Sequence, residues 1–480
     1  MVVQHNMQAM NANRMLNVTT SSQAKSTEKL SSGYKINRAA DDAAGLSISE
    51  KMRKQIRGLD RASTNAEDGV SAVQTAEGAL TEVHSMLQRM NELAVQASNG
   101  TNSESDRSAI QDEVNQLTTE IDRVSETTKF NETYLLKGQD GTKTINMKAH
   151  DAGLKGTLTD NGDGTATFKM DDLNVGDKVS IGGKNYTIGA TKDDTDKLID
   201  DVTADTSHKD IIINGDTYKY IAKAGIGDDT DAANAKGGYY KDGVVDKTNS
   251  QAQDATALKG IATAGSTVSA AGKEMTSLTD ADKTAGVKSN DSTVITTAKA
   301  YELAGKELLA ANSIGDTKGS SNVENANTNA DGSFKITLGQ ADVANSLSFS
   351  LHVGADADMT NKIQVDIESM SAAGLGIKDL NVKDKTGMAA TYAIDAIADA
   401  VSKVSAQRSA LGAVQNRLEH TIANVDNVVE NTTSAESRIR DTDMAEEMVN
   451  YSKNNILAQA GQSMLAQANQ ANQGVLSLLG

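Results

Sequence analysis

The sequence predicts an α+β protein, in which both ends of the chain form a long antiparallel coiled-coil rod and a β-rich region lies between them. Three observations predict this fold. Apolar residues recur at alternating three- and four-residue spacings at both ends, the middle is rich in turn dipeptides and short strands, and the 480 residues include no proline. Proline inside a helix costs ~3 kcal/mol, so its absence suits long uninterrupted helices.

The N-terminal part divides into a polar segment and two longer helices. Residues 1–40 are rich in Asn, Gln, Ser and Thr, and on their own predict only a weak helix. Residues 41–138 carry two apolar stripes on either side of a breaker at 98–100, and Ser103 with Asp106 is a capping-box pattern that opens the second helix. The stripes consist of Ile56, Leu59, Ala66, Val70, Val73, Leu80, Leu87 and Ala94, and of Ile110, Val114, Leu117, Ile121 and Val124.

Residues 139–387 are expected to form the outer region, mostly from short strands and turns. Asn-Gly and Asp-Gly pairs favour hairpin turns because their residues accept positive φ. One helix is predicted inside this region, at 296–312. The hairpin signals are Asp163-Gly164, Gly182-Gly183, Asn214-Gly215 and Asp331-Gly332.

Residues 388–437 predict a second long heptad helix, and 438–480 a terminal helical segment. The heptad stripe is interrupted only where Arg408 and Gln415 take inward positions. No single helix can bury such a stripe alone, so the two ends of the chain are expected to pack together. The stripe runs through Ile394, Ile397, Val401, Val404, Leu411, Leu418, Ile422, Val425 and Val429.

Composition argues against several functional classes. The formal net charge of −18 gives no basic footprint for nucleic acid. We expect no membrane-spanning segment, because no apolar run of 18 residues occurs. The first residues do not resemble a cleaved secretory signal peptide.

The sequence offers no catalytic or cofactor site. Its 6 histidines are scattered without a zinc-binding spacing, and we expect no metal, no cofactor and no enzymatic activity. The run Asp160–Gly164 lacks the alternating ligands of a calcium loop and is better interpreted as a hairpin turn.

Two segments at opposite ends of the chain carry a specific resemblance. Residues 24–46 read AKSTEKLSSGYKINRAADDAAGL and residues 456–470 read ILAQAGQSMLAQANQ, followed by VLSLL at 475–479. Both closely resemble the terminal signatures of bacterial flagellins, in the correct order and at the correct ends. The similarity covers roughly 1–138 and 388–480, whereas the middle resembles nothing specific.

The resemblance implies a structural subunit of the flagellar filament, secreted unfolded by the flagellar type III apparatus and located outside the cell. Residues 1–40 and 438–480 would form the inner tube (the D0-like domain), and 41–138 with 388–437 the outer tube (D1-like). Implied partners are further copies of the chain, the flagellar cap and hook–filament junction proteins, a secretion chaperone on the C-terminal segment, and host immune sensors. We expect no nucleic acid and no membrane among them.

Two groups of site residues follow from the resemblance. Arg89, Leu93 and Glu113 would bind the host Toll-like flagellin receptor, with Arg89 and Leu93 both pointing away from the helix seam on the heptad frame of Leu80 and Leu87. The segment for polymerisation, chaperone binding and inflammasome recognition would contain Leu457, Met464, Leu465, Val475, Leu476, Leu478 and Leu479.

Two alternatives from other classes stay open at this point. One is a secreted coiled-coil adhesin whose β-rich tip binds a ligand, which would form a stable oligomer in isolation. The other is an enzyme hidden in the middle region, which would need a cluster of polar residues that the sequence does not show.

Overall fold

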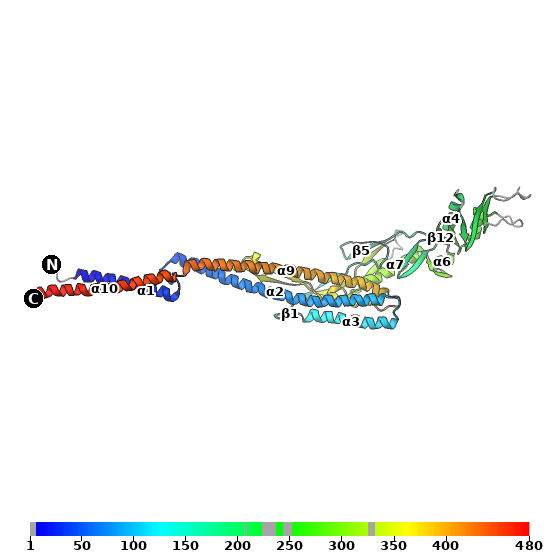
Figure 1. The fold of residues 1–480 in the computed structure, drawn as a ribbon. Coiled ribbons are helices and arrows are strands. Elements are labelled where there is room, and N and C mark those ends of the chain that lie inside the picture. Colours follow the sequence, from blue (N-terminus) through cyan, green and yellow to red (C-terminus); the bar gives the residue numbers. More distant parts are fainter. Residues whose placement is uncertain are drawn as a thin grey trace, which may run out of the picture. The chain divides into compact units, whose positions relative to one another are not determined.

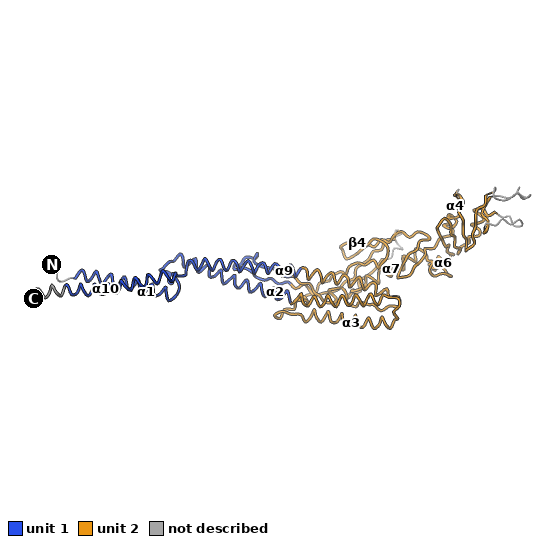
Figure 2. The backbone as a smooth tube through the Cα atoms, in the orientation of Figure 1, with its two compact units in different colours: residues 1–74, 348–365, 410–480 blue, residues 75–347, 366–409 orange. Residues whose placement is uncertain are grey.

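The computed structural model describes residues 6–205, 207, 209–222, 237–242, 252–324 and 332–479, with side chains up to residue 471. The chain forms two compact units (Figure 2), and each is described by itself. Unit 1 consists of Met1–Gln74, Ser348–Val365 and Ala410–Gly480, and unit 2 of Thr75–Leu347 and Asp366–Ser409.

The polar N-terminal segment forms a well-capped helix, α1 (Met7–Ser32). Asn6 Oδ1 accepts a hydrogen bond from Ala9 N at 2.9 Å, which satisfies one free donor of the first turn. Gly33 ends the helix in the left-handed region at φ 76°, where a residue without Cβ is least strained. Because α1 packs along α10 (Met444–Leu479), it does not depend on its own weak propensity (Figure 1).

Three further long helices confirm the predicted helical ends: α2 (Ala43–Ser98), α3 (Glu104–Thr127) and α9 (Met388–Arg440). The predicted capping box of α3 is present, since Ser103 Oγ accepts from Asp106 N and the Asp106 carboxylate accepts from Ser103 N. Residues of α2 and α9 belong to both units.

In unit 2, α2 and α9 bury the predicted stripes. Leu80, Leu87 and Ala94 of α2 are fully buried, as are Ile397 and Val404 of α9. Arg408 lies at the edge of the seam, and its guanidinium pairs with Glu77 of α2 at 3.6 Å. The coiled-coil prediction is therefore confirmed for this part of the helices.

Unit 1 contains a hairpin that covers the helices. Strands β18 (Leu347–His352) and β19 (Lys362–Ile367) pair with each other, and Ile363 packs in one cluster with Ala66 of α2 and Leu418 of α9. Leu351 of the hairpin packs closely on Gly69 of α2, where an added Cβ would lie 2.2 Å from Leu351 Cδ1 and would force that side chain to shift. The β-hairpin thus contributes to the core of the helices in this unit.

The described part of unit 2 contains five sheets. Their strand orders are β1-β2, β3-β17, β15-β16-β5-β4, β13-β14-β7-β6 and β10-β9-β8-β11-β12. The strands are β1 (Lys129–Phe130), β2 (Thr133–Tyr134), β3 (Gln139–Asn146), β4 (Gly156–Asp160), β5 (Thr165–Met170), β6 (Lys178–Ile181), β7 (Lys184–Ile188), β8 (Ile211–Ile213), β9 (Asp216–Ile221), β10 (Gly238–Lys241), β11 (Thr267–Ala270), β12 (Lys273–Thr276), β13 (Val287–Lys288), β14 (Asp291–Ile295), β15 (Asn322–Glu324), β16 (Ser333–Thr337) and β17 (Gln340–Asn345). Its short helices are α4 (Lys192–Ala204), α5 (Ala255–Ile261), α6 (Asp280–Ala285), α7 (Thr297–Asn312) and α8 (Ala372–Leu375).

The predicted turns of the middle region are confirmed where they are described. Asp163-Gly164 joins β4 to β5, Gly182-Gly183 joins β6 to β7, and Asn214-Gly215 joins β8 to β9. Asn214 has a positive φ of 54°, as a tight hairpin turn requires. Gly332 directly precedes β16, whereas Asp331 lies outside the described residues. The predicted helix at 296–312 is α7, capped by Thr296.

The sheet core of unit 2 extends onto α9. Phe168 and Phe334 face each other across β5 and β16, with ring centroids 6.3 Å apart, and Tyr392 of α9 is buried in the same cluster. Burial raises the pKa of Tyr392, so its hydroxyl stays protonated and donates to Glu307 Oε2 of α7 at 2.6 Å.

Residues 366–387 are attached to the helices of unit 2 by buried polar contacts. Arg107 of α3 is 3% exposed, and its guanidinium donates to the carbonyls of Ala97, Asn99, Asp384 and Lys385. This arginine joins the α2–α3 turn to the segment that precedes α9. Sequence analysis missed it, because an arginine beside a polar turn looks like an exposed residue.

Other donors and acceptors extend this attachment. Gln111 of α3 donates to Leu380 O at 2.8 Å and accepts from Val382 N at 2.6 Å, and Asp122 accepts from Ala372 N at 2.7 Å. The end of the predicted outer region, residues 366–387, therefore packs as part of the helical bundle in unit 2. No helix in the described ranges is long and apolar enough to cross a membrane.

Candidate functional site

The first candidate surface is the pair of terminal helices, α1 and α10, within unit 1. They lie side by side, the blue and the red helix of Figure 1. Gly461 of α10 faces Leu16 of α1, where an added Cβ would lie 3.3 Å from Leu16 Cδ1. Ala458 is buried, and Asn6 Nδ2 donates to Ala468 O at 3.2 Å. Glycine and alanine at these two positions allow a close approach but bury little apolar surface.

The base of the pair is fixed by backbone and charge contacts. Lys35 N donates to Arg440 O at 2.6 Å, and Thr442 N donates to Gly33 O at 3.0 Å. The Arg440 guanidinium lies 4.8 Å from the ring centroid of Tyr34 and pairs with Glu50 at 2.9 Å. These contacts hold the loop after α1 against the start of α10.

Most large apolar side chains of the pair remain in solvent. Those in the following list are between 48% and 71% exposed: Met7, Met10, Met15 and Val18 of α1, and Met444, Met448, Val449, Ile456, Leu457 and Met464 of α10. Large exposed apolar areas on soluble proteins usually mark sites that bind a partner. A pair of helices with apolar residues on several sides cannot bury them by itself.

The residues predicted on the C-terminal segment fall partly within this surface. Leu457 and Met464 are exposed, and Leu465 is half-buried. Helix α10 also includes Val475, Leu476, Leu478 and Leu479, but only their backbone is described. The exposed residues of α1 were not singled out from the sequence, although their spacing from Met7 to Val18 could have indicated an apolar helix face.

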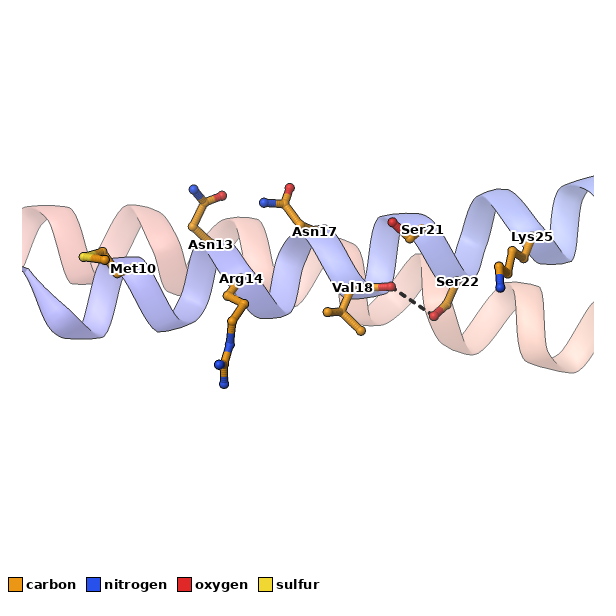
Figure 3. A pocket seen from close by; sticks show the side chains of 8 residues that line it. All are labelled: Met10, Asn13, Arg14, Asn17, Val18, Ser21, Ser22 and Lys25. Carbon is orange, nitrogen blue, oxygen red and sulfur yellow. Dashed lines mark hydrogen bonds between the residues drawn. The ribbon is translucent and has the colours of Figure 1, made fainter. Parts of the chain in front are cut away.

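Three open grooves run along the pair. Figure 3 shows the first, of about 570 Å³, where Met10 and Val18 lie among polar side chains including Asn13, Asn17 and Lys25. The second, of about 520 Å³, is mostly apolar and is lined by Met448, Val449, Ser452, Lys453, Ile456 and Leu457 of α10. The third, of about 950 Å³, lies between the two helices and includes Met15, Leu16, Leu457, Gly461 and Met464.

The second candidate surface is the predicted receptor site on α2 and α3 of unit 2. Arg89 pairs with Glu113 of α3 at 2.9 Å and with Glu92 of its own helix at 3.2 Å, and all three side chains are about half exposed or more. The hydrogen bond from Arg89 to Glu113 raises the pKa of the arginine above its ordinary value. The structure therefore brings Arg89 and Glu113 together at the surface.

The prediction that Leu93 points outward is wrong, because this side chain is 2% exposed. The heptad frame set by Leu80, Leu87 and Ala94 placed Leu93 away from the seam. Those three residues are buried, and so are Val83, Met90 and Ala97, each three residues further along the helix. With these positions in the seam, Leu93 lies next to it, and Val95, 51% exposed, is the apolar residue that faces solvent.

The described part of the chain contains no group of three or more histidine, aspartate or glutamate side chains that could hold a metal ion. Both candidate surfaces are open and lack a buried nucleophile with a neighbouring base. Their chemistry suits contacts with other macromolecules.

Comparison with known proteins gives consistent matches. Models of the bacterial flagellin N-terminal and C-terminal helical regions match residues 3–141 and 394–479. A flagellin of Clostridium tyrobutyricum is 38% identical over 478 residues, covering 98% of this chain and 100% of that protein. A flagellin of Salmonella typhimurium strain LT2 is 37% identical over 493 residues, covering 97% of this chain and 96% of that protein.

Solved structures also align with this chain. FliC from Burkholderia pseudomallei aligns with 20% identity and a TM-score of 0.26, over 73% of this chain and 99% of that chain. Flagellar hook-associated protein 3 from Legionella pneumophila aligns with 13% identity and a TM-score of 0.31, over 81% of this chain and 98% of that chain.

Proposed function

This chain belongs to the bacterial flagellin family, and from that premise we propose that the exposed apolar faces of α1 and α10 are the surfaces through which it polymerises. As a flagellin it is a structural subunit of the extracellular flagellar filament, not an enzyme. The adhesin and enzyme alternatives are thereby set aside.

One observation carries the proposal: the terminal helices leave ten large apolar side chains about half exposed or more. Covering apolar surface contributes about 25 cal/mol per Å², so neighbouring copies that cover these side chains would stabilise the helices during assembly. The contact is head-to-tail and does not close on itself, which yields a helical polymer. In this arrangement residues 1–40 and 438–480 form the inner tube, and 41–138 with 388–437 the outer tube around it.

A pair of substitutions tests this surface. Val449→Asp and Ile456→Asp place carboxylates at residues that are 67% and 66% exposed, so the monomer should fold normally. In the filament each carboxylate would be buried without a partner, and the critical concentration for seeded growth should rise about tenfold or more. Sedimentation and negative-stain microscopy measure this critical concentration.

Gln459→Asp is the matched control, because Gln459 is an exposed polar residue of the same helix. It adds the same charge without removing an apolar side chain. Normal filament growth by the two apolar-site variants, with growth of the control unchanged, would disprove the proposed surface.

The same C-terminal helix suits further partners. We propose that a secretion chaperone covers the α10 groove containing Met448, Val449, Ile456 and Leu457 before export, since an unassembled chain otherwise exposes it. Once outside the cell, the chain would meet the flagellar cap and the hook–filament junction proteins through the same terminal helices.

We also propose that the host Toll-like flagellin receptor binds the surface around Arg89 and Glu113. Arg89 presents a charged planar group and Glu113 a carboxylate, and both remain accessible in the monomer. Arginine is enriched among residues that dominate binding energy. Leu93 lies beneath this surface and supports α2 from inside, so its part in recognition is indirect.

Arg89→Ala is expected to weaken binding of the monomer to the receptor ectodomain by ~1–3 kcal/mol, the range of such anchor residues. The melting temperature should stay nearly constant, since ion pairs at exposed sites contribute little to stability. Surface plasmon resonance measures the affinity. Arg123→Ala is the control, because Arg123 is similarly exposed and pairs with Glu120 within α3. Equal affinities of wild type and Arg89→Ala would rule out the site.

A further inference from the structure

We propose that the methionines of α1 and α10 are oxidation sites through which peroxides or hypohalous acids block assembly. The inference rests on the proposed polymerisation surface. Six of the chain's 16 methionines lie on the described parts of these two helices: Met7, Met10, Met15, Met444, Met448 and Met464. Every one is 49% exposed or more.

Methionines elsewhere are less exposed, and Met52, Met86, Met275 and Met388 are of intermediate exposure. Met90, Met147, Met170 and Met370 are at most 7% exposed, and Met359 is the one large exception at 73% among the described methionines outside the terminal helices. The thioethers open to solvent are therefore concentrated on the helices that assemble. The chain has no cysteine and no tryptophan to compete for the same oxidants.

The position of these methionines makes their oxidation consequential. Each of the three grooves on the helix pair contains at least one: Met10 in the first (Figure 3), Met448 in the second, and Met15 with Met464 in the third. In the third groove, Met15 comes from α1 and Met464 from α10. A change of polarity at these methionines would therefore alter all three grooves that a neighbouring copy could fill.

The chemistry is a two-electron oxygen transfer. Hydrogen peroxide gives one oxygen atom to the thioether sulfur, forms methionine sulfoxide and leaves as water; hypochlorite leaves as chloride. The sulfur is oxidised by two electrons and the oxidant is reduced by two. A flexible apolar side chain becomes a polar one, and burying the sulfoxide oxygen without a donor is unfavourable. Methionine sulfoxide reductases reverse the change, one for each sulfur epimer.

The experiment treats the full-length monomer with dilute hydrogen peroxide and maps the products by peptide mass spectrometry. We expect oxidation of the six terminal methionines and Met359, and little at Met90, Met147, Met170 and Met370. Seeded filament growth should slow about tenfold or more, because several polar oxygens must then be buried at each contact. Treatment with both reductases should restore it.

A variant with leucine at all six terminal methionines should assemble and keep its growth rate after peroxide treatment, since leucine has no thioether. Met359→Leu is the control and should remain as sensitive as wild type. If the six-leucine variant assembles poorly, the smaller pair Met448→Leu and Met464→Leu is used, and peroxide should slow it less than wild type.

Two outcomes separate this inference from the proposal on which it rests. If untreated Val449→Asp and Ile456→Asp chains grow normally, the polymerisation surface itself is wrong. If those variants fail but a monomer oxidised at the six methionines grows at the wild-type rate, only the oxidation inference is overturned. A leucine variant that loses growth after peroxide as fully as wild type also overturns it.

Discussion

Leu93→Ala is expected to lower the free energy of unfolding of the helical bundle in unit 2 by about 2–5 kcal/mol, the range for removing a large buried aliphatic side chain. Leu93 is among the largest fully or nearly fully buried side chains, beside Met90 and Ala94 on α2. Its truncation leaves a cavity that a closely packed helix cannot easily collapse. Guanidinium unfolding followed by circular dichroism measures the change.

Val95→Ala provides the comparison, because Val95 lies two residues away on the same helix and is 51% exposed. Its effect should stay within about 0.5 kcal/mol, as for most surface substitutions. The pair also separates two explanations of weaker receptor binding. Reduced affinity of Leu93→Ala together with a lowered melting temperature indicates loss of support for α2. A Leu93→Ala protein as stable as wild type would contradict the burial described here.

A pair of deletions is expected to have opposite effects on assembly. Met147 N donates to Gly339 O at 2.8 Å, next to the paired residues Asn146 and Gln340 of β3 and β17. Replacing residues 148–338 by Asn-Gly would therefore turn β3 and β17 into a tight hairpin. The shortened chain should still form filaments, because both terminal regions and their packing remain.

Extending the deletion to residue 385 should abolish assembly. It removes Ile363, which packs on Ala66 and Leu418, and it removes the carbonyls that Arg107 binds at Asp384 and Lys385. Losing a buried aliphatic side chain costs about 2–5 kcal/mol, and each buried donor left unpaired costs ~1–3 kcal/mol.

Negative-stain microscopy and thermal unfolding distinguish the two chains. Filaments from the longer deletion would show that residues 339–385 are dispensable. Absence of filaments from the shorter one, with its helices folded, would show that the outer region takes part in assembly. The boundary at 387, predicted from composition, stays a proposal until this pair is measured; the contacts favour a boundary near 338.

Local chemistry made much of the molecule predictable from the sequence. The capping box at Ser103 and the hairpin turn at Asn214-Gly215 depend on neighbouring residues alone, and both are present. The absence of proline permitted long helices, and the 3–4 spacing identified which of them had to pack together. The terminal signatures indicated the family, which the comparisons confirm.

Tertiary packing determined which residues are buried where local sequence patterns allowed more than one arrangement. The spacing of Leu80, Leu87 and Ala94 fits two heptad frames, and only the packing of α2 showed that Met90 and Ala97 share the seam, which buries Leu93. The sequence around Arg107 suggests a surface residue, but in the fold Arg107 is buried and joins two segments. Its acceptors include carbonyls nearly 280 residues away along the chain, which no local pattern reveals. Sequence spacing records which residues can share a face, whereas burial depends on what the rest of the chain places against that face.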